Sequence, residues 1–334
     1  GYRGWEYTMS TALVMGASGF LGSHVVKQLV ADGHRVRIMV RASSDTRAID
    51  HLDLERFTAD IHDRDAVAAA MAGCDTVFYC IVDTRAWLRD PAPLYETNVE
   101  GLRKVLDVAV DAGLTRFVFT STFGTIGISP SGISTEEDAF NWWDKAPDYI
   151  RCRVQAEELL MRYCREKGLP GVVCCVGNTY GPDDVVPTPH GKMVKDAALG
   201  RMPIYWEGGG PSVGIADAAR ALVLAAEKGR VGRRYIVAER WVDFKELFSM
   251  AAGRSGVHPP RLKLPLWLLY VMSAITDVVS FLTRNDNRFS VASLRCSTLL
   301  PNVDASRARE ELGWQPRPLE ESVSEAVDYY LAQT

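Results

Sequence analysis

Two side chains that can take part in proton transfer lie four residues apart in the stretch "DYIRCRVQAEELL", at Tyr149 and Arg153. The stretch reads as a helix, and four residues are about one turn, so we expect both side chains on one face. A tyrosine hydroxyl can protonate a reacting oxygen, but its ordinary pKa of about 10 holds that proton tightly. Lowering this pKa by about three units requires roughly 4 kcal/mol. A cation about 5 Å away, at an effective dielectric of about 20, supplies roughly 3 kcal/mol of this free energy. On an isolated helix the same spacing would indicate only an exposed Tyr–Arg pair.

The glycine-rich turn "GASGFLG" is a second place where chemistry is expected. Gly16, Gly19 and Gly22 are spaced as Gly-x-x-Gly-x-x-Gly, after an apolar run at 11–15 and at the start of a helical pattern at 19–31. A nearly bare backbone there lets a pyrophosphate approach the positive end of the helix, and Gly22 lets the helix pack closely on the sheet. In this strand–turn–helix context we predict a dinucleotide site rather than a simple tight turn.

The end of the next strand indicates which dinucleotide binds. A carboxylate there would bind the ribose 2′-hydroxyl of NAD. The chain instead has Arg41, Ser43 and Ser44 after Val40. A planar cation and two hydroxyls suit a 2′-phosphate, so we predict NADP (NADPH), with NAD less favoured. The alternative is a solvated surface arginine.

The elements that must position these residues follow an alternating pattern. Strand-like runs ("DTVFYCIV", "RFVFTST", "GVVCCVG") are separated by helical segments ("AVAAAMAG", "YETNVEGLRKVLDVAVDAG"). This alternation predicts an α/β fold: a Rossmann-type doubly wound parallel sheet with a smaller, partly interleaved C-terminal substrate lid. We assign 9–180 to the dinucleotide-binding domain, with 212–240 returning to it, and 181–211 and 241–334 to the lid. Residues 1–8 are interpreted as an extension or a cloning remnant.

Composition limits the function classes. Hydrophobic residues make up 47% and charged residues 24% of the chain, and the net charge is −4, so the chain is globular and no attraction to nucleic acid is indicated. The seven cysteines form no Cys-x-x-Cys pair, so no metal site is predicted. No signal peptide is recognised, and a reduced, cytoplasmic protein is expected.

A strongly apolar segment occurs near the C-terminus at 266–282. Its polar residues Ser273, Thr276, Asp277 and Ser280 fall on one narrow stripe at helical spacing. A transmembrane segment is not expected, because the run is shorter than about 20 residues and carries Asp277. We predict a core helix of the lid. The alternatives are a wall of the substrate site and peripheral membrane contact through 264–283.

Together with "GNTYGP", "GIADAARALVLAAEKG" and "DASRAREELGW", these motifs resemble the extended short-chain dehydrogenase/reductase family (the NAD-dependent epimerase/dehydratase superfamily) over about 11–330. The dihydroflavonol reductase, cinnamoyl-CoA reductase and 3β-hydroxysteroid dehydrogenase branch is the most similar. The resemblance implies that Tyr149 is the catalytic acid/base, that Thr122 replaces the usual catalytic Ser, and that Asn98 is the active-site asparagine. Arg153 replaces the usual Lys. The cofactor-binding positions implied by the turn and the resemblance are Gly16, Ser18, Gly19, Phe20, Leu21, Gly22, Arg41, Ser43, Ser44, Asp60, Ile61, Cys80, Ile81, Val82, Thr120, Tyr149, Arg153, Val176, Asn178 and Thr179. A second Tyr-x-x-x-Lys match, Tyr163 and Lys167, lies near the end of the same helix. The family tyrosine lies near the start of this helix, so Tyr149 is the better match.

The resemblance implies hydride transfer between nicotinamide and the carbonyl or alcohol of a bulky hydrophobic substrate. Steroid-like, flavonoid-like and acyl-CoA thioester substrates are the candidates. Tryptophans in the variable regions are expected to shape the pocket: Trp142, Trp143, Trp206 and Trp267.

Two other functions stay open. A nucleotide-sugar epimerase or dehydratase would need a basic diphosphate clamp, which Lys192, Lys195 and Arg201 could supply. A noncatalytic NADP-binding sensor would explain Arg153, whose guanidinium does not readily give up a proton. The helices at about 96–112 and 150–167 resemble those that pair subunits in this family, so a homodimer is expected.

Overall fold

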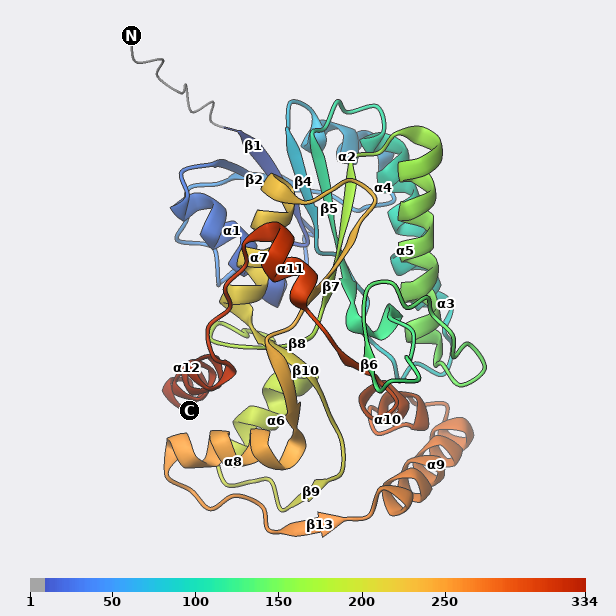
Figure 1. The fold of residues 1–334 in the computed structure, drawn as a ribbon, viewed down its shortest axis with the longest axis vertical. Coiled ribbons are helices and arrows are strands. Elements are labelled where there is room, and N and C mark those ends of the chain that lie inside the picture. Colours follow the sequence, from blue (N-terminus) through green and yellow to red (C-terminus); the bar gives the residue numbers. More distant parts are fainter. Residues whose placement is uncertain (1–9) are drawn as a thin grey trace.

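A parallel sheet of seven strands forms the centre of the computed structural model, which describes residues 10–334 (Figure 1). The interpretation of 1–8 as an extension therefore lies outside the described residues. The strand order is β11-β7-β5-β4-β1-β2-β3, and every neighbouring pair is parallel. The strands are β1 (Thr11–Met15), β2 (Arg35–Val40), β3 (Glu55–Thr58), β4 (Thr76–Tyr79), β5 (Arg116–Thr122), β7 (Gly171–Val176) and β11 (Arg234–Val237). The order reverses between β1 and β4, which is the position where doubly wound sheets bind ligands. This confirms the predicted fold class.

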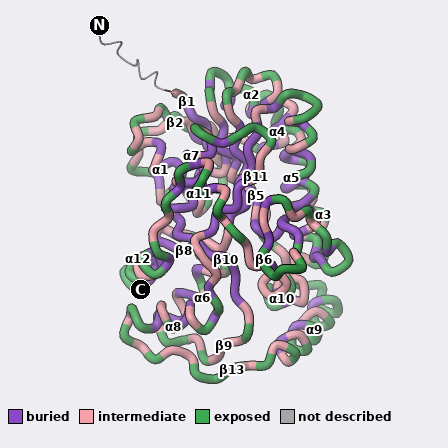
Figure 2. The backbone as a smooth tube through the Cα atoms, viewed as in Figure 1, coloured by how far each residue is buried: buried purple, intermediate pink, exposed green. Residues whose placement is uncertain are grey.

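Helices cover both faces of the sheet, so its central strands are continuous apolar runs. On one face α2 (Arg64–Met71), α4 (Leu102–Ala109) and α5 (Asp148–Lys167) pack on side chains such as Phe117 and Phe119. On the other face α1 (Phe20–Ala31), α7 (Ile215–Lys228) and α11 (Ser306–Leu312) pack on side chains such as Val14 and Phe78. The buried residues concentrate between these layers (Figure 2).

The long helix predicted over "YETNVEGLRKVLDVAVDAG" contains an irregularity. A short helix α3 (Ala92–Tyr95) runs into a π-helical segment, Glu96–Gly101, before α4 begins. A Cβ at Gly101 would lie 2.3 Å from Cδ1 of Ile61, so this turn packs closely on the loop after β3. Such segments are frequent at functional sites, and this one contains Asn98.

The lid is built around a third core cluster. Its strands are β8 (Asn178–Tyr180), β10 (Gly209–Gly214) and β12 (Arg240–Asp243) in one sheet and β9 (Ile204–Trp206) and β13 (Leu262–Leu264) in another. Its helices are α6 (Pro189–Ala198), α8 (Phe244–Ser255), α9 (Leu266–Thr283), α10 (Val291–Thr298) and α12 (Leu319–Ala332). The short strands β6 (Ile133–Ser134) and β14 (Asn302–Val303) pair with each other, and a 3-10 turn, η2 (Phe123–Thr125), follows β5.

One part of the predicted lid belongs with the central sheet. Ala308, Leu312 and Trp314 are buried in the core under α7, and Trp314 Nε1 donates to the carbonyl of Asp217 at 2.9 Å. The segment 306–314 therefore returns to the first domain, in place of the predicted continuous lid at 241–334.

The prediction that 266–282 forms a core helix of the lid is wrong. The segment is helical, as α9, but only 17% of it is buried. By length and composition α9 is the one helix in the described chain that could cross a membrane. The predicted polar stripe exists, and it faces inward: Ser273 and Ser280 are buried. A stripe on a helix does not by itself tell which face turns toward the protein.

Candidate functional site

The glycine turn fits a dinucleotide pyrophosphate. Gly16 has a φ of +76°, and a Cβ there would lie 2.8 Å from the backbone carbonyl of Cys80, while a Cβ at Gly22 would lie 2.2 Å from Gly16 O. Gly19 caps α1 without a side-chain hydrogen bond, and the first turn of α1 carries no acidic residue. The backbone N–H groups of this turn can therefore receive an anion.

The carboxyl ends of β1 and β4 bring further predicted cofactor residues to this turn. Cys80 follows β4, and its N–H donates to Met15 O at 2.9 Å. Thr120 on β5 donates its hydroxyl to Cys80 Sγ at 3.5 Å. Ile81 is half-buried and Val82 is exposed. These residues lie at the edge of the sheet beside the turn, where a cofactor could contact them.

Arg41 lies at the carboxyl end of β2 with its side chain exposed. Its backbone N–H donates to the hydroxyl of Ser44 at 3.0 Å, and Ser44 N–H donates to Arg41 O at 3.0 Å. This small turn holds both side chains at the edge of the sheet. Within residues 10–334 the Arg41 guanidinium has no ion-pair partner, so it can pair with a ligand anion.

Asp60 and Ile61 take different places at the end of β3. Asp60 is exposed, and its carboxylate accepts the N–H of His62 at 2.8 Å. Ile61 is buried against Gly101. Asp60 can therefore contact a ligand directly, whereas Ile61 packs against Gly101 in the π-helical segment.

Asn98 holds the loop that follows β4. Its side-chain oxygen accepts the N–H of Asp83 at 2.8 Å, and its amide nitrogen donates to Asp83 O at 2.9 Å. The same amide lies 3.4 Å from Cys152 Sγ on α5. Asn98 thus ties three elements together, which indicates a positioning role.

Tyr149 and Arg153 share the buried face of α5. Nη2 of Arg153 donates to Thr120 O at 2.5 Å, and its guanidinium carbon lies 5.5 Å from the centre of the Phe119 ring. Arg153 is only 3% exposed, and its Nε has no hydrogen-bond partner among the described residues. A buried, incompletely paired guanidinium is a place where a ligand oxygen is expected.

The Tyr149 ring packs among apolar side chains. Its neighbours in this cluster include Trp142 and Ile150 and, from the lid, Leu299 and Leu300. Burial raises the pKa of Tyr149 to about 12, although the charge of Arg153 acts to lower it. The spacing predicts that the cation lowers this pKa below its ordinary value. The structure shows the opposite direction, because desolvation is the larger effect.

Thr122 ends β5 and caps the turn η2. Its hydroxyl oxygen accepts the N–H of Gly124 at 3.2 Å, which leaves its proton for another acceptor. Val176 ends the neighbouring strand β7, and Asn178 and Thr179 begin β8 directly beyond it. Thr122, Val176 and Asn178 thus gather at one end of the sheet.

The second Tyr-x-x-x-Lys pair is structural. The hydroxyl of Tyr163 donates to the Asp107 carboxylate at 2.5 Å, and Lys167 Nζ lies 3.9 Å from the same carboxylate. The pair ties α5 to α4 near the far end of the helix.

Glu157, which is not among the predicted site residues, organises the end of β5. Its carboxylate is buried, accepts the hydroxyls of Ser121 at 2.6 Å and Thr125 at 2.7 Å, and lies 2.7 Å from Nε of Arg234. Thr122 lies between the two hydroxyl donors, so Glu157 fixes its position. The sequence feature that indicates Glu157 is its position one turn beyond Arg153, on the same face of the helix.

Substituting Glu157 with glutamine should destabilise the protein by about 1.5–3 kcal/mol, because the Ser121 and Thr125 hydroxyls lose a charged acceptor and the half-buried Arg234 loses its ion-pair partner. The free energy of unfolding, measured by urea titration, tests this. Glu158→Gln on the exposed side of α5 is the matched control and should change it by less than about 0.5 kcal/mol. Equal effects of the two variants would contradict the assigned role.

The predicted tryptophans do not form one wall. Trp142 is buried beside Tyr149, and Trp143 is 39% exposed. Trp206 packs on Phe244, with ring centres 4.9 Å apart. Trp267 is 67% exposed on α9. Trp142 therefore packs in the Tyr149 cluster, and Trp143 reaches its edge through the Phe140 ring, with ring centres 4.8 Å apart.

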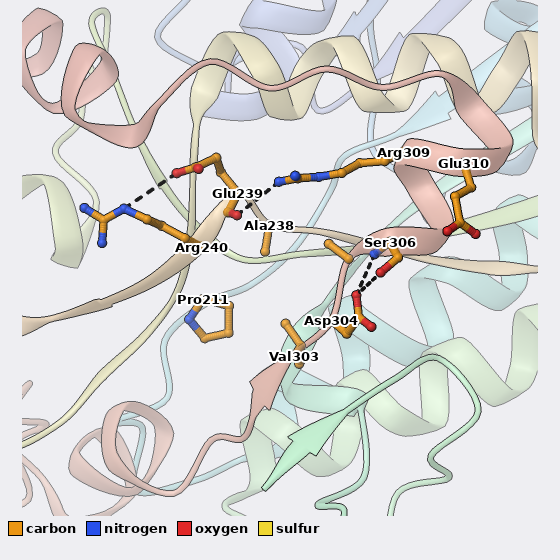
Figure 3. Close-up of a pocket in the computed structure, with 10 residues that line it drawn as sticks. Pro211, Ala238, Glu239, Arg240, Val303, Asp304, Ser306, Arg309 and Glu310 are labelled. Carbon is orange, nitrogen blue, oxygen red and sulfur yellow. Dashed lines mark hydrogen bonds and ion pairs between the residues drawn. The ribbon is translucent and has the colours of Figure 1, made fainter.

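A cavity of about 330 Å³ lies elsewhere, between the lid sheet and α11 (Figure 3). Arg309 donates to Glu239 O at 3.2 Å, and Arg240 Nε lies 3.8 Å from the Glu239 carboxylate. None of the predicted site residues lines this cavity. The lining residues are Pro211, Ala238, Glu239, Arg240, Val303, Asp304, Ala305, Ser306, Arg309 and Glu310.

The chain resembles known proteins in both sequence and structure. Residues 12–238 match the model of the NAD dependent epimerase/dehydratase family. The chain is 31% identical over 323 residues to sterol demethylase protein B of Methylococcus capsulatus, covering 96% of this chain and 98% of that protein. It is 26% identical to a putative dihydroflavonol 4-reductase of Synechocystis, covering 98% and 96%. The crystal structure of gox2253 superposes with a TM-score of 0.85 at 31% identity, covering 97% and 98% of the two chains.

Proposed function

The chain belongs to the NAD-dependent epimerase/dehydratase family, in its extended short-chain dehydrogenase/reductase branch, and from this premise we propose that it is an NADP(H)-dependent oxidoreductase. It would transfer hydride between nicotinamide and the carbonyl or alcohol of a bulky hydrophobic substrate. The observation that carries this proposal is Tyr149, protonated at neutral pH, in an apolar cluster beside the buried cation of Arg153.

The cofactor, when bound, supplies or accepts the hydride. The glycine turn would hold its pyrophosphate, and Arg41 with Ser43 and Ser44 would hold the 2′-phosphate. Arg153 would bind a ribose hydroxyl through the guanidinium edge that the protein leaves without a partner. Tyr149 would give its proton to the carbonyl oxygen, and Thr122 would orient that oxygen by a hydrogen bond.

The substrate class follows from the surroundings of Tyr149. Trp142, Leu299 and Leu300 pack in its cluster and form an apolar boundary. A sterol-like ring system would bury apolar surface there, and the name of the Methylococcus relative supports this class. Because Leu299 and Leu300 follow α10, the lid would close over the substrate from that side.

Arg41 should decide the cofactor preference. We expect NADPH to bind more tightly than NADH, and Arg41→Ala to remove roughly 1.5–3 kcal/mol of that difference, since one charged hydrogen-bonding partner of the 2′-phosphate is lost. Calorimetric titration of both cofactors measures this. Arg47→Ala is a control, because Arg47 is paired with Asp45 at 2.6 Å. Equal affinities of the unsubstituted protein for NADPH and NADH would contradict the proposal.

The pH dependence of reduction should reflect the raised pKa of Tyr149. The protonated hydroxyl is the donor, so the rate of carbonyl reduction with NADPH should stay level from neutral pH to about pH 10. It should fall only as the pH approaches the pKa of about 12. Single-turnover rates, with folding checked by circular dichroism at each pH, test this. A fall centred near pH 8 would show that another group donates the proton.

We also propose that the protein is a homodimer paired through α4 and α5, two neighbouring helices on one face of the sheet. Light scattering at micromolar concentration tests the state of assembly. A single monomeric species would contradict this proposal and leave the proposed chemistry unaffected.

A further inference from the structure

The helix α9 (Leu266–Thr283) is attached to the protein by its polar side. Ser273 and Ser280 are buried, and the Asp277 carboxylate accepts the N–H of Val291 at the start of α10 at 3.2 Å. The hydroxyls of Tyr270 and Thr298 lie 2.6 Å apart, which joins α9 to the end of α10. These contacts fix the rotation of α9 about its own axis.

The outward side of α9 is apolar from Trp267 to Leu282. The helix lies at the edge of the molecule (Figure 1), and its outward residues are exposed (Figure 2). Every exposed side chain between Trp267 and Leu282 is apolar, with Phe281 at 75% and Leu282 at 73%. The large ones are Trp267, Val271, Met272, Ile275, Val278, Val279, Phe281 and Leu282. This orientation is the reverse of an ordinary surface helix, so the face requires an apolar partner.

Exposed cations lie at both ends of α9. Arg261 and Lys263 precede the helix, and Arg284 and Arg288 follow it. The neighbouring acidic residue Asp286 accepts the N–H of Arg89 at 2.9 Å, and its carboxylate lies 3.8 Å from Nε of Arg89. An apolar strip between basic ends is complementary to a bilayer whose headgroups are negatively charged.

We propose that α9 binds the surface of an anionic phospholipid bilayer, with its axis in the membrane plane and its outward face among the acyl chains. A second copy of this chain fits the face less well, because a symmetric pairing would bring the basic ends of both copies together. A spanning helix fits less well too. Its 18 residues measure about 27 Å against a hydrocarbon core of about 30 Å, and spanning would break the contacts with α10.

The attachment would place the membrane close to the proposed site. Leu299 and Leu300, which follow α10, pack in the same cluster as Tyr149, and the contact between Tyr270 and Thr298 joins α9 to the end of α10. A substrate dissolved in the bilayer could then enter near Tyr149. This consequence rests on the proposed function, whereas the membrane contact itself does not.

Vesicle co-sedimentation of the full chain tests the proposal. Vesicles of phosphatidylcholine alone are compared with an equal mixture of phosphatidylcholine and phosphatidylglycerol. We expect binding to the anionic mixture that weakens as salt is added. The double variant Val278→Gln/Val279→Gln should bind at least about tenfold more weakly, because each side chain loses its burial in the acyl region. Val231→Gln, in the turn before β11, removes an exposed valine of similar exposure outside α9 and should bind as the unsubstituted chain does.

Three results would overturn the proposal. The first is no binding to either vesicle composition. The second is retention in the membrane after washing at alkaline pH, which indicates a spanning helix. The third is a dimer in light scattering that Val278→Gln/Val279→Gln converts to monomer without any vesicle binding, which assigns the face to a second copy. NADPH affinity, measured in parallel, reports on the proposed function separately.

Discussion

Tyr149→Phe is expected to lower turnover by a factor on the order of 10³ or more, while NADPH binding stays within about twofold of the unsubstituted protein. The ring and its packing in the cluster around Trp142 and Ile150 remain, so only the proton donor is lost. Steady-state rates with a hydrophobic ketone, and cofactor affinity by calorimetry, measure the two quantities separately.

Tyr163→Phe is the matched control for this experiment. It makes the same change on the same helix, but its hydroxyl bonds Asp107, far from the predicted site. Turnover should be retained in this variant. If Tyr149→Phe turned over as fast as Tyr163→Phe, the acid would be on another residue.

Arg153→Met is expected to lower turnover by a factor on the order of 10² to 10³. A cation about 5 Å from the hydroxyl, at an effective dielectric of about 20, contributes roughly 3 kcal/mol to stabilising negative charge on that oxygen. The substitution also removes the donor to Thr120 O and the proposed ribose contact, so NADPH should bind at least about tenfold more weakly. The pKa of Tyr149 should rise further, because Arg153 is the group that opposes the effect of burial.

Arg153→Lys tests whether catalysis depends on the positive charge at this position or on the shape of the guanidinium group. It keeps the cation, so turnover should be retained or increased relative to the unsubstituted protein. Arg162→Met, on the exposed side of α5, is the control for loss of a cation on this helix and should change neither rate nor affinity. Turnover that is the same for Arg153→Met and Arg162→Met would remove Arg153 from the mechanism.

Much of the scaffold was predictable because its signals are local. Buried parallel strands are continuous apolar runs, and the glycines of the first turn have a steric requirement that no other residue meets, as the 2.2 Å approach at Gly22 shows. The edge strand β3 (Glu55–Thr58) was not predicted, since its side chains are mostly exposed and polar. The π-helical turn around Asn98 was missed because one widened turn barely changes the helical periodicity.

Other features depend on tertiary contacts that a linear pattern does not contain. The polar stripe of α9 was recognised, but which side would face the protein follows from its contact with Val291. The packing of Trp314 under α7 joins residues almost a hundred positions apart. The Tyr149–Arg153 spacing predicts both side chains on one face, yet the pKa of the tyrosine depends more on burial among apolar side chains than on the neighbouring cation.

The central claim is that this chain moves hydride from nicotinamide to a carbonyl carbon with Tyr149 as the proton donor. NADPH deuterated at both C4 positions of the nicotinamide tests it most directly, with mass spectrometry of the products from a panel of sterol-like ketones. The account predicts one deuterium on the new carbinol carbon with the unsubstituted protein, and almost no labelled alcohol with Tyr149→Phe. Tight NADPH binding without labelled alcohol from any ketone, in the unsubstituted protein and in Arg153→Lys, would contradict it and indicate a noncatalytic NADP-binding protein.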